Sequence, residues 1–258
     1  MYEEVQTLNG VMLRCQLTDG SFTEKSVGDD STRVSLRKMS ITSVNLAPLG
    51  QLQKLEHLSV SYNPLQVINL APLTTCKKLR VIRMTGCALE SVDLIPLEKL
   101  VHLEQLSISF NNLTTIDLSP LSHSNLEILT INRNNLKNID LTPLSSCLKL
   151  KTLNIGQNPI DSVNLEPLAS CSNLLSLVLN RTPIQSIDLS PFEDLNNLKG
   201  LDLSNNQLKL VDLRPLKQCN EMQEINLEDN PLETVLVRKG FHCHSVKVNR
   251  NTKIKEIE

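Results

Sequence analysis

The most compact group with metal-binding chemistry in this sequence is the tripeptide His242-Cys243-His244. Imidazole and thiolate groups are preferred zinc ligands, and a structural zinc site needs four ligands. In a strand, His242 and His244 would share one face and Cys243 would point to the other. Two ligands on one face are too few, so we interpret the tripeptide as part of a surface cap and expect no metal and no cofactor. A metal held by His242 and His244 is the alternative.

A column of acidic and amide side chains recurs along the chain at a fixed spacing. Carboxylates that repeat about 5 Å apart in stacked coils could bind calcium. However, Asp and Asn alternate freely in this column, and both residue types often accept hydrogen bonds from backbone amides in turns. We therefore predict turn-capping residues rather than a calcium site. The column consists of Asn45, Asn69, Asp93, Asp117, Asp140, Asn164, Asp188 and Asp212.

Four of the seven cysteines occupy one position of the same repeat, where other copies carry leucine. Exchange of Cys with Leu is typical of a small buried apolar side chain. We predict reduced core thiols rather than disulfides or metal ligands, and the odd total favours a reducing compartment, so we expect a cytoplasmic protein. The four are Cys76, Cys147, Cys171 and Cys219.

Motifs that would indicate catalysis are absent from the sequence. It contains no phosphate-binding glycine loop, HExxH, CxxC or nucleophile elbow. The net charge of −2, the 2% aromatic content and the lack of Trp disfavour nucleic acid and glycan partners. No apolar run has the length of a membrane span. We therefore predict a non-enzymatic protein that binds neither nucleic acid nor membrane.

The elements that position these columns come from a repeat of about 24 residues. One copy reads LEILTINRNNLKNIDLTPLSSCLK, from Leu126 to Lys149. Leu129 and Ile131 alternate with polar residues, which predicts a short strand. A single copy cannot bury its apolar face alone, so successive copies must stack on one another and form a parallel sheet.

Two further columns complete each copy. Asparagines follow the strand, and an amide in an apolar coil must have its hydrogen bonds satisfied, so we predict a structural ladder of Asn63, Asn111, Asn134, Asn158, Asn206 and Asn230. Prolines at the opposite side predict one or two turns of α- or 3₁₀-helix. Ser119, Thr142 and Ser190 precede three of these prolines, and we predict that they are N-caps.

The consensus LxxLxLxxNxLxxIDLxPL resembles the leucine-rich repeat (LRR) family over residues 31–236, and its IDLxPL half is also similar to the internalin repeat. The resemblance implies an α/β class fold: a right-handed, curved LRR solenoid. Its parallel β-sheet would form the concave face, and short α- or 3₁₀-turns the convex face. It also implies a scaffold for protein–protein interaction.

The two ends depart from the repeat. Residues 1–30 predict a β-hairpin around Asp19-Gly20 that caps the solenoid, residues 31–236 hold about nine coils, and residues 237–258 form a C-terminal cap with a last strand and a charged tail. We expect a single domain and a monomer.

The concave face is the candidate site. Its charge grades from basic at the N-terminal end to acidic at the C-terminal end, which would orient a protein partner. Aromatic and arginine side chains commonly dominate binding energy. We predict partner-binding residues Tyr62, Val81, Arg83, Phe110, Ile128, Arg133 and Arg181. Alternatives are a regulatory or targeting domain of a larger multidomain protein, or glycan or nucleic-acid binding.

Overall fold

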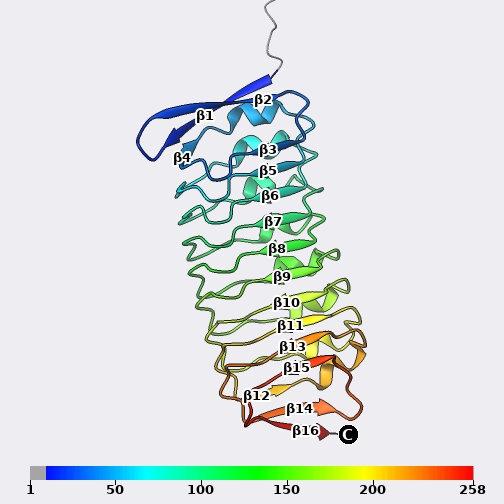
Figure 1. The fold of residues 1–258 in the computed structure, drawn as a ribbon. Helices are drawn as coiled ribbons and strands as arrows, with labels where there is room; N and C mark the ends of the chain where they lie inside the picture. The colour runs from blue at the N-terminus through cyan, green and yellow to red at the C-terminus, as the bar shows by residue number, and fades with distance from the viewer. Residues whose placement is uncertain (1–9, 258) are drawn as a thin grey trace, which may run out of the picture.

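The computed structural model describes residues 10–257, which wind into one elongated right-handed solenoid (Figure 1). Each coil contributes one short strand to a common sheet, and the chain returns through the opposite side of the coil. The strands lie one above another from the N-terminal to the C-terminal end, as the repeat predicts. The fold is therefore the α/β LRR solenoid expected from the sequence.

The main sheet has ten parallel strands of three residues each. Its central residues pair in register from coil to coil, as in Leu106, Leu129 and Leu153, which are all fully buried. Their neighbours on each side point to the open face. In chain order the strands are β3 (Arg33–Ser35), β5 (His57–Ser59), β6 (Val81–Arg83), β7 (Gln105–Ser107), β8 (Ile128–Thr130), β9 (Thr152–Asn154), β10 (Ser176–Val178), β11 (Gly200–Asp202), β13 (Glu224–Asn226) and β15 (Ser245–Lys247).

Short 3₁₀-helices form the opposite side of the coils, and no α-helix occurs between residues 10 and 257. Each of the eight has Pro in its first two positions. They are η1 (Ala47–Gln51), η2 (Ala71–Thr75), η3 (Ile95–Leu97), η4 (Ser119–Leu121), η5 (Thr142–Ser146), η6 (Glu166–Ser170), η7 (Ser190–Phe192) and η8 (Arg214–Gln218).

The prediction that Ser119, Thr142 and Ser190 are N-caps is wrong. Each is the first residue of its 3₁₀-helix, and the leucine before it occupies the cap position without any side-chain hydrogen bond. Leucine can take this place because the Asp/Asn column already accepts the first helical N–H from two residues upstream.

One apolar core runs the length of the solenoid, from Val11 to Val237. The repeated cysteines belong to it, as predicted: all four are buried, and burial raises the pKa of Cys147, Cys171 and Cys219 to about 11. Each of the four thiols also donates to a carbonyl of the preceding coil, at 2.9–3.5 Å. These thiols therefore pack and join neighbouring coils rather than react.

At the N-terminal end, β1 (Gly10–Leu17) and β2 (Phe22–Gly28) form an antiparallel hairpin, and β1 also pairs with β4 (Ile41–Val44). The hairpin lies across the first coil (Figure 1). The fully buried Leu13 and Cys15 belong to the core of the solenoid. Residues 1–9 of the expected cap lie outside the described residues.

At the C-terminal end, a small parallel sheet joins β12 (Leu210–Asp212), β14 (Thr234–Arg238) and β16 (Lys253–Ile257). The sequence predicted a last strand at Val246 and Val248; β15 contains Val246 and ends one residue before Val248, and it is not the last strand. The segment expected to be a charged tail differs: it forms β16, because the edge of β14 offers it a ladder of backbone hydrogen bonds. No helix among residues 10–257 has the length and apolar character that crossing a bilayer would require.

Candidate binding face

The six ladder asparagines lie in the turn that follows each strand, and all are buried, with at most 7% of their surface exposed. Asn158 illustrates the arrangement. Its Nδ2 donates to the carbonyl of Ile155 in its own coil and to that of Ile131 in the preceding coil, at 2.9 and 3.1 Å. Its Oδ1 accepts the N–H of Leu136, also in the preceding coil. Every ladder Asn makes the equivalent bond to the preceding coil, at 2.7–3.1 Å. The amides thus fix the spacing of the coils directly beside the open face.

Besides Met39 in the first coil, two coils carry other residues in this column. Cys87 donates its thiol to the carbonyl of Val60 in the preceding coil, at 3.3 Å. The Thr182 hydroxyl instead lies 2.9 Å from the carbonyl of Leu179 in its own coil and 2.5 Å from Asn206 Oδ1 in the following coil, and it makes no bond to the preceding coil. The ladder therefore has a weak step between the coils of Asn158 and Thr182.

The Asp/Asn column lies at the start of the 3₁₀-helices, on the opposite side from the ladder. In all eight coils its Oδ1 accepts the backbone N–H two residues later, at 2.8–3.0 Å. The turn-capping role predicted from the sequence is therefore confirmed. Between residues 10 and 257, no three His, Cys, Asp or Glu side chains are grouped so that they could hold a metal ion.

The predicted anchors Tyr62, Phe110, Arg133 and Arg181 lie beyond the strand ends, immediately before the ladder position. All four have a left-handed backbone, with φ between 53° and 62°. In this column the coil must turn sharply, and the N–H of each residue donates to the following coil. Gly or Asn would adopt this conformation at the least cost, whereas bulky side chains here cost on the order of 1 kcal/mol each. The same position is left-handed in the other coils, at Lys38, Gly86, Gln157, Asn205 and Asp229, so the coil turn sets this conformation and places the side chains at the edge of the open face.

Two of these anchors are aromatic rings held by arginines. The guanidinium of Arg37 lies 4.7 Å from the centre of the Tyr62 ring, and that of Arg133 lies 4.5 Å from the centre of the Phe110 ring. Gly86 separates the two rings, and a Cβ at that position would lie 3.0 Å from Tyr62. Both rings remain 45% exposed, so they are ordered and accessible at once.

The other three predicted residues lie on the strands themselves. Arg83 is exposed on β6 and donates to Gln105 Oε1 at 2.9 Å. Ile128 on β8 is half-buried. Val81 is only 8% exposed, because the longer side chains of His57 and Gln105 flank it in the neighbouring strands. Val81 thus offers a partner little surface.

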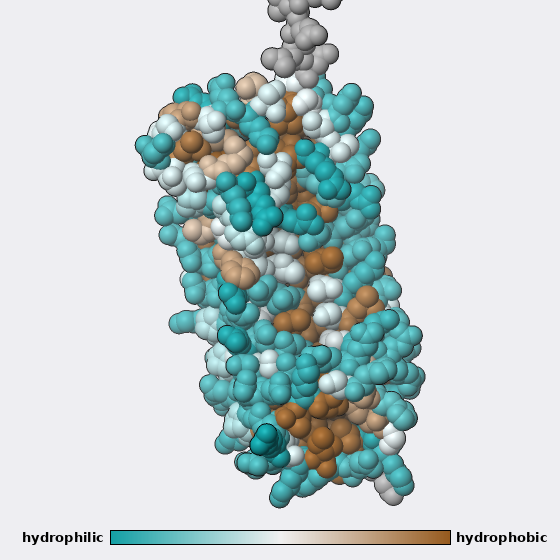
Figure 2. Space-filling model, in the orientation of Figure 1, coloured by the Kyte–Doolittle hydropathy of each residue, from teal (hydrophilic) through white to brown (hydrophobic). Residues whose placement is uncertain are grey.

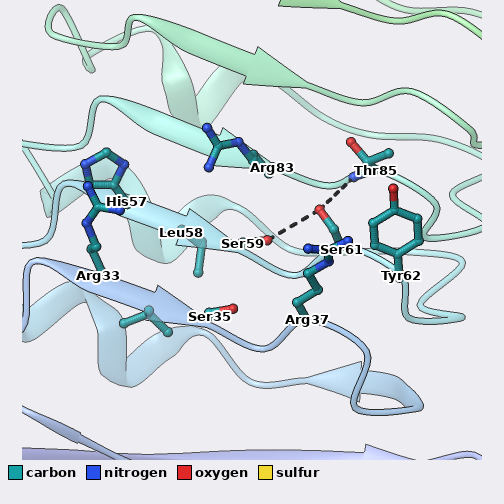
Figure 3. A pocket seen from close by; sticks show the side chains of 11 residues that line it. Arg33, Ser35, Arg37, His57, Leu58, Ser59, Ser61, Tyr62, Arg83 and Thr85 are labelled. Atoms are coloured by element: carbon teal, nitrogen blue, oxygen red, sulfur yellow. Dashed lines mark hydrogen bonds between the residues drawn. The ribbon is translucent and has the colours of Figure 1, made fainter.

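A shallow pocket of about 500 Å³ opens at the N-terminal end of this face, over β3, β5 and β6 (Figure 3). Three arginines line it, together with His57, Tyr62 and several hydroxyl groups. Figure 3 shows Arg33 beside His57 on one side, Arg37 near Tyr62 on the other, and Ser59 and Ser61 between them. Sequence reasoning did not single out Arg33, Arg37 or His57 as site residues. The signal that could have found them is the recurrence of cations at facing positions of neighbouring coils.

The His242-Cys243-His244 segment lies in the loop before β15 rather than in a strand. His244 Nδ1 lies 3.2 Å from the carbonyl of Met222, and Cys243 Sγ donates to the carbonyl of Ser245. The histidine and the thiol therefore contact backbone groups of the last coils.

Family models and solved structures agree with this geometry. The model described as BspA type leucine rich repeat region matches residues 49–164, and one described as leucine rich repeat matches residues 172–232. The chain is a leucine-rich-repeat protein. No curated protein matches the sequence significantly.

Several solved structures have the same fold as this LRR protein. An internalin of Listeria monocytogenes, internalin F, matches 80% of the chain with 22% identity and a TM-score of 0.58. Internalin C2 of the same organism matches 64% with 33% identity and a TM-score of 0.50. The LRR ectodomain of the plant membrane receptor kinase GASSHO1/SCHENGEN3 from Arabidopsis thaliana, in complex with CASPARIAN STRIP INTEGRITY FACTOR 2, matches 98% with 17% identity and a TM-score of 0.68. The chain covers 66%, 66% and 33% of these structures, respectively.

Proteins of the LRR class commonly act as interaction scaffolds, because the solenoid presents an extended concave surface. In this LRR protein, Figure 2 shows isolated brown, apolar side chains among white and teal ones on the face drawn, with a larger brown area over the C-terminal coils. The open face carries Arg33, Arg37 and Arg83 in its first coils and Asp202, Glu228 and Asp229 in its last. The charge gradient expected from the sequence therefore lies along one face, on the strands and the turns that follow them.

Proposed function

We propose that this LRR protein is a non-enzymatic scaffold that binds another protein along its concave face. The observation that carries the proposal is the column of left-handed residues, which holds two ordered but exposed aromatic rings and two exposed arginines beside a rigid sheet. Side chains of these types contribute most of the energy of protein interfaces when a partner excludes water from them. The anchors are Tyr62, Arg83, Phe110, Arg133 and Arg181.

Charge complementarity supports a protein rather than a polyanion. A nucleic acid or an acidic glycan that followed the sheet would meet Asp202, Glu228 and Asp229 at its far end, and like charges there would oppose binding. A protein surface that is acidic at one end and basic at the other would match both ends. We further propose a monomer that acts in the cytoplasm, supported by cysteines that are all free within residues 10–257.

The second candidate is a regulatory or targeting domain of a larger protein. It is favoured by the coverage of the solved relatives, since the chain corresponds to only part of each of them. In that case binding would involve the convex side or the two end caps, and replacing the concave anchors would leave binding intact.

Partner capture from native lysate separates these proposals. Alanine at the five anchors should abolish capture by the concave face while the melting temperature stays close to that of the wild type. The matched control replaces exposed residues of the convex side, Ile95→Ala, Lys99→Ala and Leu148→Ala, and should capture the same partner. Loss of capture by the convex variant alone would reject the concave face as the site.

A further inference from the structure

The pocket at the N-terminal end of the concave face holds a concentration of positive charge without counter-charge. None of its lining residues is acidic, although Arg33, Arg37 and Arg83 all contribute to its walls. Within residues 10–257 none of these three arginines takes part in an ion pair, whereas six lysines and arginines elsewhere pair with carboxylates of a neighbouring coil or segment. The pocket therefore concentrates three positive charges that no carboxylate of the described residues pairs with.

Two of the three pocket arginines, Arg37 and Arg83, contact neutral partners. Arg83 donates one N–H to Gln105 Oε1, at 2.9 Å, and Arg37 stacks on the Tyr62 ring. A guanidinium has five N–H donors, so each keeps several for a ligand. Lys25 of the hairpin adds a further charge at the rim, where its Nζ donates to the carbonyl of Ser35 at 2.9 Å. These contacts restrict Arg37, Arg83 and Lys25, so less side-chain entropy would be lost when they bind an anion.

The floor of the pocket is polar. Ser59 Oγ donates to Ser61 Oγ at 3.4 Å, and Ser61 Oγ also accepts the N–H of Thr85 at 3.2 Å, which leaves the Ser61 hydroxyl hydrogen available (Figure 3). His57 Nδ1 is buried and has no hydrogen-bond partner among the described residues. Burial, and after it the charge of Arg33, lower the pKa of His57. The floor therefore offers donors and one unsatisfied nitrogen.

The group that fits is a compact dianion with several oxygens. Arginine binds carboxylate and phosphate through paired N–H donors. Three guanidiniums and a set of hydroxyls exceed what one carboxylate can accept, whereas a phosphate monoester carries about two negative charges and three acceptor oxygens. The acidic C-terminal end of the same face excludes an extended polyanion, so the phosphate must be a local group on an otherwise mixed-charge ligand.

From this geometry we infer that the pocket of Arg33, Arg37 and Arg83 binds a phosphorylated side chain of the partner protein. The inference rests on the proposed function in that the phosphate is carried by the protein bound to the concave face. Phosphorylation of the partner would then control its docking, with the phosphate in this pocket and a basic segment against Asp202, Glu228 and Asp229.

Small probes test the pocket without the partner. The measurement is nuclear magnetic resonance of the arginine Nε–Hε groups during titration with N-acetyl-O-phosphoserine methylamide. We expect saturable shifts at Arg33, Arg37 and Arg83, and binding at least tenfold weaker for N-acetyl-aspartate methylamide. Equal binding of the two probes, or the absence of a saturable shift, overturns the inference. Tighter binding of a 20-residue uridine oligonucleotide through the same arginines also overturns it, in favour of nucleic acid.

Variants localise the effect. Arg33→Gln, Arg37→Gln and Arg83→Gln together should weaken phosphoserine binding at least tenfold. The matched control removes the same charge from exposed positions elsewhere, with Arg14→Gln, Arg238→Gln and Arg250→Gln. This control should change the affinity for phosphoserine less than twofold. Equal weakening by both sets means unspecific attraction and rejects the pocket.

A second readout uses wild-type protein only. In the free protein the charges of Arg33, Arg80 and Arg83 lower the pKa of His57, and that of Glu56 raises it. A bound dianion favours the charged imidazolium, so saturating phosphoserine probe should raise the pKa of His57. An unchanged pKa contradicts binding at this floor. Failure of the probes with continued capture through Phe110, Arg133 and Arg181 would reject the inference and leave the proposed function standing. Binding of the probe without any capture of a partner by the concave face would support the phosphate pocket and reject the proposed function.

Discussion

Two columns of short polar side chains run the length of this solenoid and differ in their exposure to water. The ladder asparagines beside the open face are buried, and their amides bridge neighbouring coils. The outer Asp/Asn column is mostly exposed, and each side chain accepts one N–H two residues along its own coil. Both columns satisfy backbone groups at a turn.

The difference explains which residues each column accepts. The outer acceptor needs only one oxygen near water, so Asp serves as well as Asn and occupies five of its eight places. The inner position needs two donors and an acceptor in an apolar coil, and a carboxylate there would be charged, buried and without donors. Asp never fills the ladder. Burial, rather than the turn, therefore selects the residue type.

The largest expected effect on stability comes from placing Asp, which is common in the outer column, at a position of the buried Asn ladder. Asn158→Asp should lower the free energy of unfolding by about 3–5 kcal/mol at neutral pH, because an unpaired buried charge would face the carbonyls of Ile131 and Ile155. The matched control, Asn164→Asp in the outer column, should change it by less than about 0.5 kcal/mol. Denaturant unfolding measures both, and similar losses would remove the distinction between the columns.

Deleting an inner amide should have a smaller but clear effect. Asn134→Ala strands the carbonyls of Ile108 and Ile131 and the N–H of Leu113, which predicts a loss of about 1–3 kcal/mol. A melting curve that Asn134→Ala leaves unchanged would show that the ladder does not stabilise the solenoid.

At Thr182, where the ladder lacks a bond to the preceding coil, a substitution should increase stability rather than decrease it. Thr182→Asn would place donors against the carbonyls of Ile155 and Leu179, as in the other coils, and should raise the free energy of unfolding by about 1 kcal/mol. Thr182→Val, which removes the hydroxyl contacts with Leu179 and Asn206, is the matched comparison and should destabilise. If Thr182→Asn were also destabilising, the coil-to-coil bond would not be the missing element.

The outer column should respond weakly to the same kind of deletion. Asn164→Ala removes one exposed hydrogen bond to the N–H of Glu166 and should cost about 0.5 kcal/mol. Thermal unfolding of both variants compares the loss of stability in Asn164→Ala with that in Asn134→Ala. A loss from Asn164→Ala as large as that from Asn134→Ala would mean that exposure does not govern the contribution.

The smallest expected effect is on how the stability of the protein depends on pH in the acidic range. Hydrogen bonds from Thr142 lower the pKa of Asp140, and those from Ser119 and Ser190 lower the pKa of Asp117 and Asp188. A lowered folded pKa means that these carboxylates contribute stability above the ordinary carboxyl pKa of about 4, and that this contribution is lost as pH falls through the folded pKa.

The triple variant Asp117→Asn, Asp140→Asn and Asp188→Asn should therefore lose less stability than wild type on acidification below about pH 4. Unfolding curves at several pH values measure this slope. An identical slope would show that these three hydrogen bonds to carboxylates are not formed in solution.

The sequence predicted the solenoid, the sheet, the buried thiols and the turn-capping Asp/Asn column, because each follows from a period that repeats in every coil. Deviations within single coils were harder. Ser119, Thr142 and Ser190 have the residue types of N-caps, but the carboxylate upstream already accepts their N–H. The charged end of the chain forms β16, because pairing with β14 outweighs its low apolar content.

At the candidate site, too, the repeat predicted the general arrangement but not the features of single coils. Alternation placed Arg83 and Ile128 on the open face, but the buried state of Val81 depends on the lengths of His57 and Gln105 in neighbouring coils. Gly86 and Asn205 have the residue types that mark a left-handed turn, but the types of Tyr62 and Phe110 in the same column do not indicate this conformation. The partner-binding role of these residues stays a prediction.

Native-state hydrogen exchange tests the central claim, that the buried ladder joins the coils into one rigid face while the outer column only finishes local turns. The N–H groups of Leu89, Leu136 and Leu208 donate to ladder oxygens, and those of Ile95, Thr142 and Glu166 donate to the outer column. We predict that the first set exchanges only through global unfolding, whereas the second exchanges orders of magnitude faster through local opening. Equal protection of the two sets would contradict the account.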